Sequence, residues 1–226
     1  MTGAMTLGRG RDVHLHRYSA PKSQRLAPSS QLQACGGYLL VWIRTVEPED
    51  ADGRLAEAYE WQARKLGRPT EFTQLGSLAP EVVHARLSLY RASENVPSRL
   101  SQSQKLLISY LTSILNATPH CASLARTQLC DVGEERLVRA LDRGDYAALD
   151  AADAALARYV EKLTLRPGNM VEGDVEALRR VGFDDLDILD ANNQCAHLNY
   201  TNRVANGLGL VSEAAAEERS RDRVPQ

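Results

Sequence analysis

Residues 184–209 read DDLDILDANNQCAHLNYTNRVANGLG, and this stretch decides the fold class. Asp184 is a good helix N-cap because its carboxylate can accept hydrogen bonds from the free amides of the first turn. Gly207 is a typical residue at a helix C-terminus. No proline and no alternating β-branched run interrupts the stretch. The sequence therefore predicts one long helix here.

One face of this predicted helix carries a polar stripe. Asn192, Cys195, Asn199 and Asn202 recur at spacings of three and four, which places them on the same face. Amides without Lys or Glu are unusual on a solvated face, so we expect the stripe to line a cavity or to form hydrogen bonds across a subunit interface. His197 lies off the stripe. We interpret it as structural, because Cys195 and His197 have no evident third partner for a metal.

Six more segments have the caps or periodicity of helices. Ser101 and Gln104 have the spacing of a capping box before an apolar run, and Thr118-Pro119 is a strong helix start. The other four segments are residues 47–69, 79–96, 150–168 and 172–182. We expect an all-α domain of about seven helices.

Composition and charge limit the class of protein. Aromatic residues make up only 5% of the 226 residues and Ala and Leu dominate, which favours helices over sheets. A net charge of −2 predicts no general attraction to nucleic acid or to anionic membranes. No apolar run approaches the roughly 20 residues of a membrane span, and the N-terminus lacks the apolar core of a secretory signal. We expect a cytoplasmic protein with reduced thiols.

The two ends of the chain differ from its centre. Residues 1–40 are rich in Ser, Pro, Gly, Arg and Gln, which predicts a disordered extension. The alternative is a wrongly chosen start codon, with the protein beginning near Val41. We expect residues 41–212 to form the domain and residues 213–226 to form a flexible tail.

The cysteine pattern fits neither a zinc motif nor a disulfide framework, with Cys35, Cys121, Cys130 and Cys195 as the four thiols. Cys130 lies about 13 Å from Cys121 along the same predicted helix and on its opposite face, which is beyond disulfide reach. A small buried hydrophobe is the simplest interpretation of each cysteine.

Cys121 is the best candidate for a reactive thiol. Thr118 caps the predicted helix, so Cys121 falls in the first turn, where free amides and the helix dipole should lower its pKa. His120 is adjacent and can add charge or carry a proton. A buried structural cysteine beside a solvated histidine is an equally good interpretation of these two residues.

Three segments together resemble one known family. They are VWIRTVEPEDADGRLAEAYE (residues 41–60), NATPHC (residues 116–121) and the whole of residues 159–210. They are similar to the peroxidase-related branch of the carboxymuconolactone decarboxylase / alkylhydroperoxidase AhpD-like superfamily, most specifically in the LT-x-x-P turn and the closing N-x-x-N-R-x-A-x-x-L-G. The resemblance implies an all-α helical bundle that assembles as a homo-oligomer.

The redox site that the resemblance implies is incomplete. Redox-active members open a helix with Cys-x-x-Cys, with a His four residues later and a Glu in the preceding helix. Cys121 matches the second cysteine, but the other three positions hold Thr118, Ala125 and Leu106. Without a thiol at 118 no local disulfide can form, and without the His and the Glu the proton relay is missing.

Three functions therefore stay open. The first is a one-cysteine oxidoreductase in which Cys121 reduces hydroperoxides and is recycled by an external thiol or by Cys195. The second is a non-redox enzyme of decarboxylase, lyase or isomerase type, with His120 as the acid or base. The third is a non-catalytic oligomeric relative. We expect a small-molecule substrate and no cofactor, metal, nucleic acid or membrane partner. Candidate substrate-binding or supporting residues are Tyr110, Asn116, Thr118, Asn192, Cys195, Asn199 and Asn202.

Overall fold

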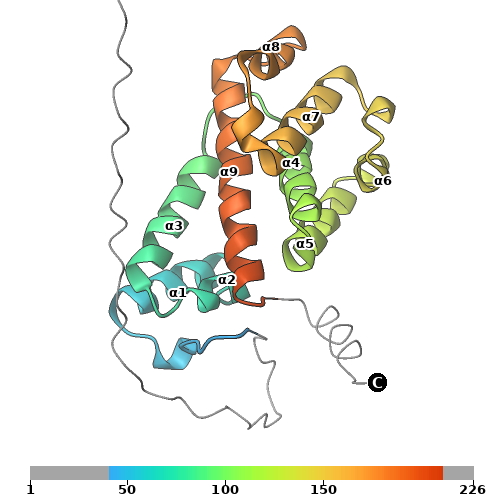
Figure 1. The fold of residues 1–226 in the computed structure, drawn as a ribbon. Coiled ribbons are helices and arrows are strands. Elements are labelled where there is room, and N and C mark those ends of the chain that lie inside the picture. The colour runs from blue at the N-terminus through green and yellow to red at the C-terminus, as the bar shows by residue number, and fades with distance from the viewer. Residues whose placement is uncertain (1–40, 211–226) are drawn as a thin grey trace, which may run out of the picture. The chain divides into compact units, whose positions relative to one another are not determined.

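The computed structural model describes residues 41–210. The predictions for residues 1–40, which include Cys35, and for residues 213–226 lie outside the described residues. Within residues 41–210 the chain forms nine α-helices and three short 3-10 turns, with no β-strand (Figure 1). No helix in this range is both long and apolar enough to cross a lipid bilayer. The predicted all-α fold is confirmed, whereas the homo-oligomer stays a prediction.

All seven predicted helices are present, and two short ones are added. The unpredicted helices, α2 and α6, are shorter than the roughly 11–18 residues over which helical periodicity becomes clear. The helices are α1 (Gly53–Leu66), α2 (Glu71–Leu75), α3 (Pro80–Glu94), α4 (Gln102–Leu115), α5 (Pro119–Asp131), α6 (Glu135–Arg143), α7 (Ala151–Leu165), α8 (Glu172–Arg180) and α9 (Asp185–Gly207). The 3-10 turns are η1 (Pro48–Asp50), η2 (Tyr146–Ala148) and η3 (Pro167–Asn169).

Local capping sets most of the helix ends. Ser101 and Gln104 form the predicted reciprocal capping box at the start of α4. Asp184 caps α9 as expected. At the other end of α9, Gly207 is the last helical residue, and Gly209 takes the left-handed conformation with φ of 77°. The left-handed glycine that terminates α9 is therefore Gly209, two residues after the Gly207 expected from the sequence.

Helix α4 lies at the centre of the main core, packed against α5, α7 and α9 (Figure 1). Its Leu107, Ile108 and Leu111 are at most 1% exposed. Helix α9 also contacts α3 and α8. The start of α5 and one face of α9 are thus held against the same central helix.

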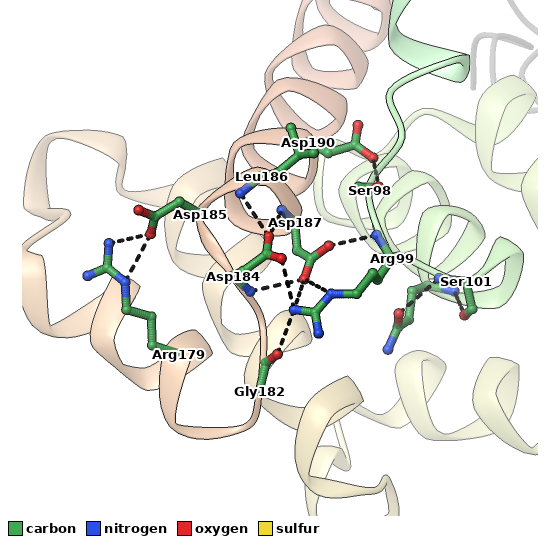
Figure 2. Close-up of polar contacts among 11 residues, drawn as sticks. Ser98, Arg99, Ser101, Arg179, Gly182, Asp184, Asp185, Leu186, Asp187 and Asp190 are labelled. Atoms are coloured by element: carbon green, nitrogen blue, oxygen red, sulfur yellow. Dashed lines mark hydrogen bonds and ion pairs between the residues drawn. The ribbon is translucent and has the colours of Figure 1, made fainter.

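A cluster of buried carboxylates fixes the start of α9 against the segment that precedes α4 (Figure 2). Asp187, 1% exposed, accepts the backbone amide of Arg99 at 2.7 Å and its guanidinium at 2.6 Å. Asp190, fully buried, accepts Ser98 Oγ at 2.5 Å and pairs with Lys105 Nζ at 3.2 Å. Because buried carboxylates are stable only when paired, these contacts fix the position of α9 relative to α4.

Candidate functional site

The polar stripe of α9 is buried against α4 and α7 of the same chain. Cys195 is fully buried, with its Sγ 3.4 Å from Thr164 Oγ1 and 3.7 Å from Thr112 Oγ1. Asn202, also fully buried, donates to Ser113 Oγ at 3.4 Å. The expectation that the stripe lines a cavity or crosses a subunit interface is wrong, because these polar groups find their partners within the chain's own core.

Amide hydrogen bonds extend this stripe to the start of α5. Asn199 Nδ2 donates to Thr164 Oγ1 at 3.2 Å, and Asn199 Oδ1 accepts Asn116 Nδ2 at 3.0 Å. Asn206 Nδ2 donates to the Asn116 carbonyl at 2.8 Å and to Thr118 Oγ1 at 3.0 Å. We call these five residues the amide network. It joins α7, α9, the end of α4 and the residue before α5. Asn192, the remaining member of the stripe, instead accepts Tyr159 Oη at 2.9 Å.

Thr118 stands at the N-cap position of α5, but its side chain makes no capping hydrogen bond. The prediction that it caps the helix is therefore wrong, because its hydroxyl is engaged by Asn206 instead. Ala117, just before it, has φ of 50° and is the only non-glycine residue of the described range with positive φ. Its amide bonds to the Ile114 carbonyl at 3.0 Å, and the Thr118 amide bonds to the Ser113 carbonyl at 2.9 Å, the pair of bonds of a Schellman motif. An L-residue in this conformation costs about 1–2 kcal/mol, so the α4–α5 junction is strained.

Cys121 lies in the first turn of α5, as predicted, but it is not an activated thiol. It is half-buried and free. Burial raises its pKa to about 11, and no charged side chain of residues 41–210 offsets that effect. The expected lowering of its pKa is wrong, because desolvation of the thiolate outweighs the helix N-terminus. At pH 7 only about one Cys121 in ten thousand is ionised.

His120 does not assist the thiol. Burial lowers its pKa, and the carboxylate of Glu71 at the start of α2 opposes this in part. In residues 41–210, no hydrogen bond joins the imidazole to Cys121. Nor do three His, Cys, Asp or Glu side chains gather in this range so that they could hold a metal ion.

Tyr110 is tied into helix packing. Its hydroxyl donates to the carboxylate of Asp142 on α6, which also pairs with Arg126 on α5 at 3.3 Å. Burial, and then the Asp142 carboxylate, raise the pKa of Tyr110 to about 12. The side chain is 3% exposed, so it connects α4, α5 and α6 and does not face a substrate.

A cavity of about 680 Å³ opens between α3, α4, α5 and α9. This volume lies within the range of small-molecule sites, roughly 300–1,000 Å³. Cys121 is not on its wall. The nearest lining residue of α5 is Gln128, about 10 Å further along the helix axis. The wall is formed by Tyr90, Ser93, Glu94, Leu100, Gln102, Lys105, Leu106, Ser109, Gln128, Asp131, Val132, Gln194, His197 and Leu198.

Two ring side chains on this wall are in contact. The ring centres of Tyr90 on α3 and His197 on α9 lie 5.8 Å apart, with planes tilted by 35°. Burial, and then the charge of Arg86, lower the pKa of His197. Burial, and then the neighbouring Glu94, raise the pKa of Tyr90. The pair therefore holds a neutral imidazole and a protonated phenol at neutral pH. No sequence pattern indicates this pair, since only the packing of α3 on α9 brings the two rings together.

Known structures show where this fold occurs. No protein-family model and no curated protein sequence matches the chain. An uncharacterized peroxidase-related protein from Silicibacter sp. TM1040 is 26% identical with a TM-score of 0.63, over 71% of this chain and 85% of that chain. The alkylhydroperoxidase AhpD core of a peroxidase-related protein from Ralstonia eutropha JMP134 is 19% identical with a TM-score of 0.68. The match covers 78% of this chain and 94% of that chain.

The chain has the fold of AhpD-like, peroxidase-related proteins.

The debrominase Bmp8 has a similar fold. A cysteine-to-alanine variant of that enzyme, solved in complex with 2,3,4-tribromopyrrole, is 14% identical to this chain with a TM-score of 0.64. The match covers 79% of this chain and 95% of that chain. At this identity the likeness concerns the fold alone.

In this AhpD-like chain, the three positions that depart from the redox pattern have roles in packing or in the cavity wall. Thr118 is 1% exposed and bonds to Asn206. Ala125 is 5% exposed within the main core. Leu106 packs against that core and lines the cavity. Of the four positions in the redox pattern, only Cys121 holds the expected residue, and the polar groups of the last helix bond to Thr118 and Asn116 and not to this thiol.

Proposed function

We propose that this AhpD-like protein is a non-redox enzyme that moves a proton to and from a carbon atom of a small carbonyl compound. The compound binds in the cavity between α3, α4, α5 and α9. The observation that carries the proposal is the Tyr90–His197 ring pair on the wall of a 680 Å³ cavity that no cysteine lines.

The chemistry follows from the protonation states of the pair. The neutral imidazole of His197 accepts a proton from the carbon next to the carbonyl, and the electron pair of that C–H bond moves into an enolate. The Tyr90 hydroxyl, whose raised pKa keeps it protonated, donates a hydrogen bond to the oxygen on which the charge develops. The imidazolium then returns the proton to the same carbon or to a neighbouring one.

Proton exchange in D₂O tests this proposal before the natural substrate is known. The full chain is incubated with small ketones, 2-oxo acids and 3-oxo acids, and loss of the C–H signal is followed by NMR. We expect exchange with some members of the panel and a loss of about 100-fold or more in His197→Gln, the range of general acid–base catalysis. Tyr90→Phe should lower the exchange rate about 10–100-fold, which is no more than the usual effect of removing one hydrogen-bond donor from an oxyanion hole.

Two matched variants control this experiment. His84→Gln changes a histidine of α3 that bonds to Arg54 on the surface, and Cys121→Ser removes the half-buried thiol. Both should exchange at the wild-type rate. If His197→Gln exchanges as fast as the wild type, the proposed role of the cavity is wrong.

A second candidate function is hydroperoxide reduction by Cys121 with an external thiol as reductant. It is favoured by one observation, the half-exposed position of Cys121 in the first turn of α5. The thiolate would attack the O–O bond and become a sulfenic acid with release of an alcohol, and the external thiol would reduce that sulfenic acid in turn. Dimedone labelling of Cys121 after peroxide treatment, faster in the native chain than in the urea-unfolded chain, would support this function over the first.

A further inference from the structure

Helices α3 and α9 each expose an apolar stripe with the 3.5-residue repeat of a helix–helix seam. On α3 the stripe is Val82, Ala85, Leu89 and Ala92, at spacings of three, four and three. On α9 it is Leu186, Leu189, Asn193, Ala196 and Tyr200, at spacings of three, four, three and four. The large side chains of both stripes are between 39% and 57% exposed. Repeats of this kind normally pack against another helix, and no helix of residues 41–210 covers either stripe.

The two stripes form one continuous face. The rings of Tyr90 and His197 are in contact, and the segment after α3 bonds to the start of α9, so the two helices run antiparallel (Figure 1). In an antiparallel pair, the residue that precedes each contacting residue turns to the same side. These preceding residues are Leu89 and Ala196, one from each stripe. The apolar face thus lies on the side of both helices that is opposite their buried residues.

The face is large enough for a stable protein–protein interface. Two helices side by side are about 20 Å wide, and the 23 residues of α9 extend about 34 Å, so the face covers roughly 600 Å² in projection. Two such faces together reach roughly 1,200 Å², the lower end of the range for stable interfaces. A second copy of this chain presents the same face.

The charges beside the α9 stripe suit a second copy that runs antiparallel. Asp185 and Arg203 lie about five turns apart on the same edge of the stripe, near opposite ends of α9. Arg203 donates to the Asn199 carbonyl at 3.0 Å and pairs with no carboxylate of residues 41–210. The side chain of Asp185 is 83% exposed and pairs with Arg179, which also binds Glu176. An antiparallel copy therefore brings each Arg203 beside the other copy's Asp185, twice by symmetry.

We propose that α3 and α9 form the interface of a two-fold dimer of this chain, with each α9 antiparallel to α9 of the partner subunit. Pairing of Asp185 with the partner's Arg203 sets the register, which places Leu189 against the partner's Tyr200 and Asn193 against the partner's Ala196. A single polar residue inside an apolar seam specifies the register at some cost in stability, and this is the role of Asn193. The dimer does not depend on the reaction proposed for the cavity.

Sedimentation equilibrium of the full chain measures the dimer and its dissociation constant. We expect Leu89→Glu and Leu189→Glu each to raise the dissociation constant of the dimer at least about 100-fold, because a two-fold interface buries the new carboxylate twice. Leu124→Glu, which changes an equally exposed leucine on α5, should leave the dimer intact. All three side chains are more than half exposed, so the core of the monomer is unchanged.

Charge reversal tests the direction of the paired helices. Arg203→Glu should raise the dissociation constant about 10-fold, and the addition of Asp185→Arg to the same chain should restore most of the affinity. A double variant that binds no better than Arg203→Glu would refute the antiparallel arrangement. Far-UV circular dichroism verifies the helices of each variant. If the glutamate variants of the leucines do not fold, the charge-reversal pair decides, since it changes no apolar residue.

Three results would overturn the interface. One is a full chain that sediments as a monomer, whether its apolar face is then bare or covered by residues 1–40 or 211–226. Another is an oligomer that both Leu89→Glu and Leu189→Glu leave unchanged. The third is an equal loss of the dimer in Leu124→Glu, because that leucine lies outside the face.

Discussion

The alkylation rate of Cys121 as a function of pH is the most quantitative consequence of the structure. The ordinary pKa of a cysteine is 9.0, and burial raises that of Cys121 to about 11. At any pH well below both values, each unit of pKa lowers the thiolate fraction tenfold. Cys121 should therefore carry about 100 times less thiolate than an ordinary thiol, and only the thiolate reacts with iodoacetamide.

The assay compares the same residue in two states of the same chain. The native and the urea-unfolded protein are alkylated between pH 6 and pH 10, quenched, digested and quantified at the peptide that contains Cys121. The native rate should be at least about 100-fold below the unfolded rate at pH 7, because half-burial also restricts access. It should rise about tenfold per pH unit through pH 9 without levelling off. A native rate equal to the unfolded one, or a plateau below pH 8, would refute the assignment of Cys121 as an unactivated thiol.

Three further predictions concern stability, measured by urea unfolding of the full chain. Ala117→Gly should stabilise it by about 0.5–1 kcal/mol, since relief of the left-handed strain exceeds the added entropy of the unfolded chain; a destabilised variant would refute the strain. Asn206→Ala should cost about 1–3 kcal/mol through its two lost hydrogen bonds, whereas Asn193→Ala on the exposed side of α9 should cost almost nothing. Asp187→Asn should cost about 2–3 kcal/mol at pH 7, somewhat less than a fully buried pair because Arg99 is exposed. Burial raises the pKa of Asp187, but hydrogen bonds from the Asp184 and Arg99 amides and from the Arg99 guanidinium outweigh it and lower the pKa overall. The advantage of the wild type is thus present above the unfolded pKa of about 4 and is lost as pH falls through the lower folded value; a cost that does not shrink toward pH 3 would contradict this.

The helices could be predicted because their signals are local. Ser101, Gln104 and Asp184 act on amides within three residues of themselves, so sequence spacing contains the whole interaction. Thr118 shows the limit of this reasoning. It has the right residue type at the right position, but Asn206, far away in the sequence, competes successfully for its hydroxyl.

The candidate site depends on tertiary contacts, which is why less of it could be predicted. Periodicity showed that Cys195 and Asn199 share a face and need partners, but not that α4 and α7 supply them. The helix start near Cys121 was predicted correctly, but the burial that raises the pKa of Cys121 comes from tertiary packing. The proposed acid–base role of His197 rests on its contact with Tyr90, which lies on a helix distant in the sequence.

We propose that the function of this protein with an AhpD-like fold lies in the cavity at His197 and not at Cys121. The most direct test measures proton exchange in D₂O and hydroperoxide consumption side by side for the full chain, for His197→Gln and for Cys121→Ser. We expect proton exchange that survives Cys121→Ser and is lost in His197→Gln, and no peroxide consumption that depends on Cys121. Peroxide consumption that disappears in Cys121→Ser, with no exchange by any of the three proteins, would contradict it.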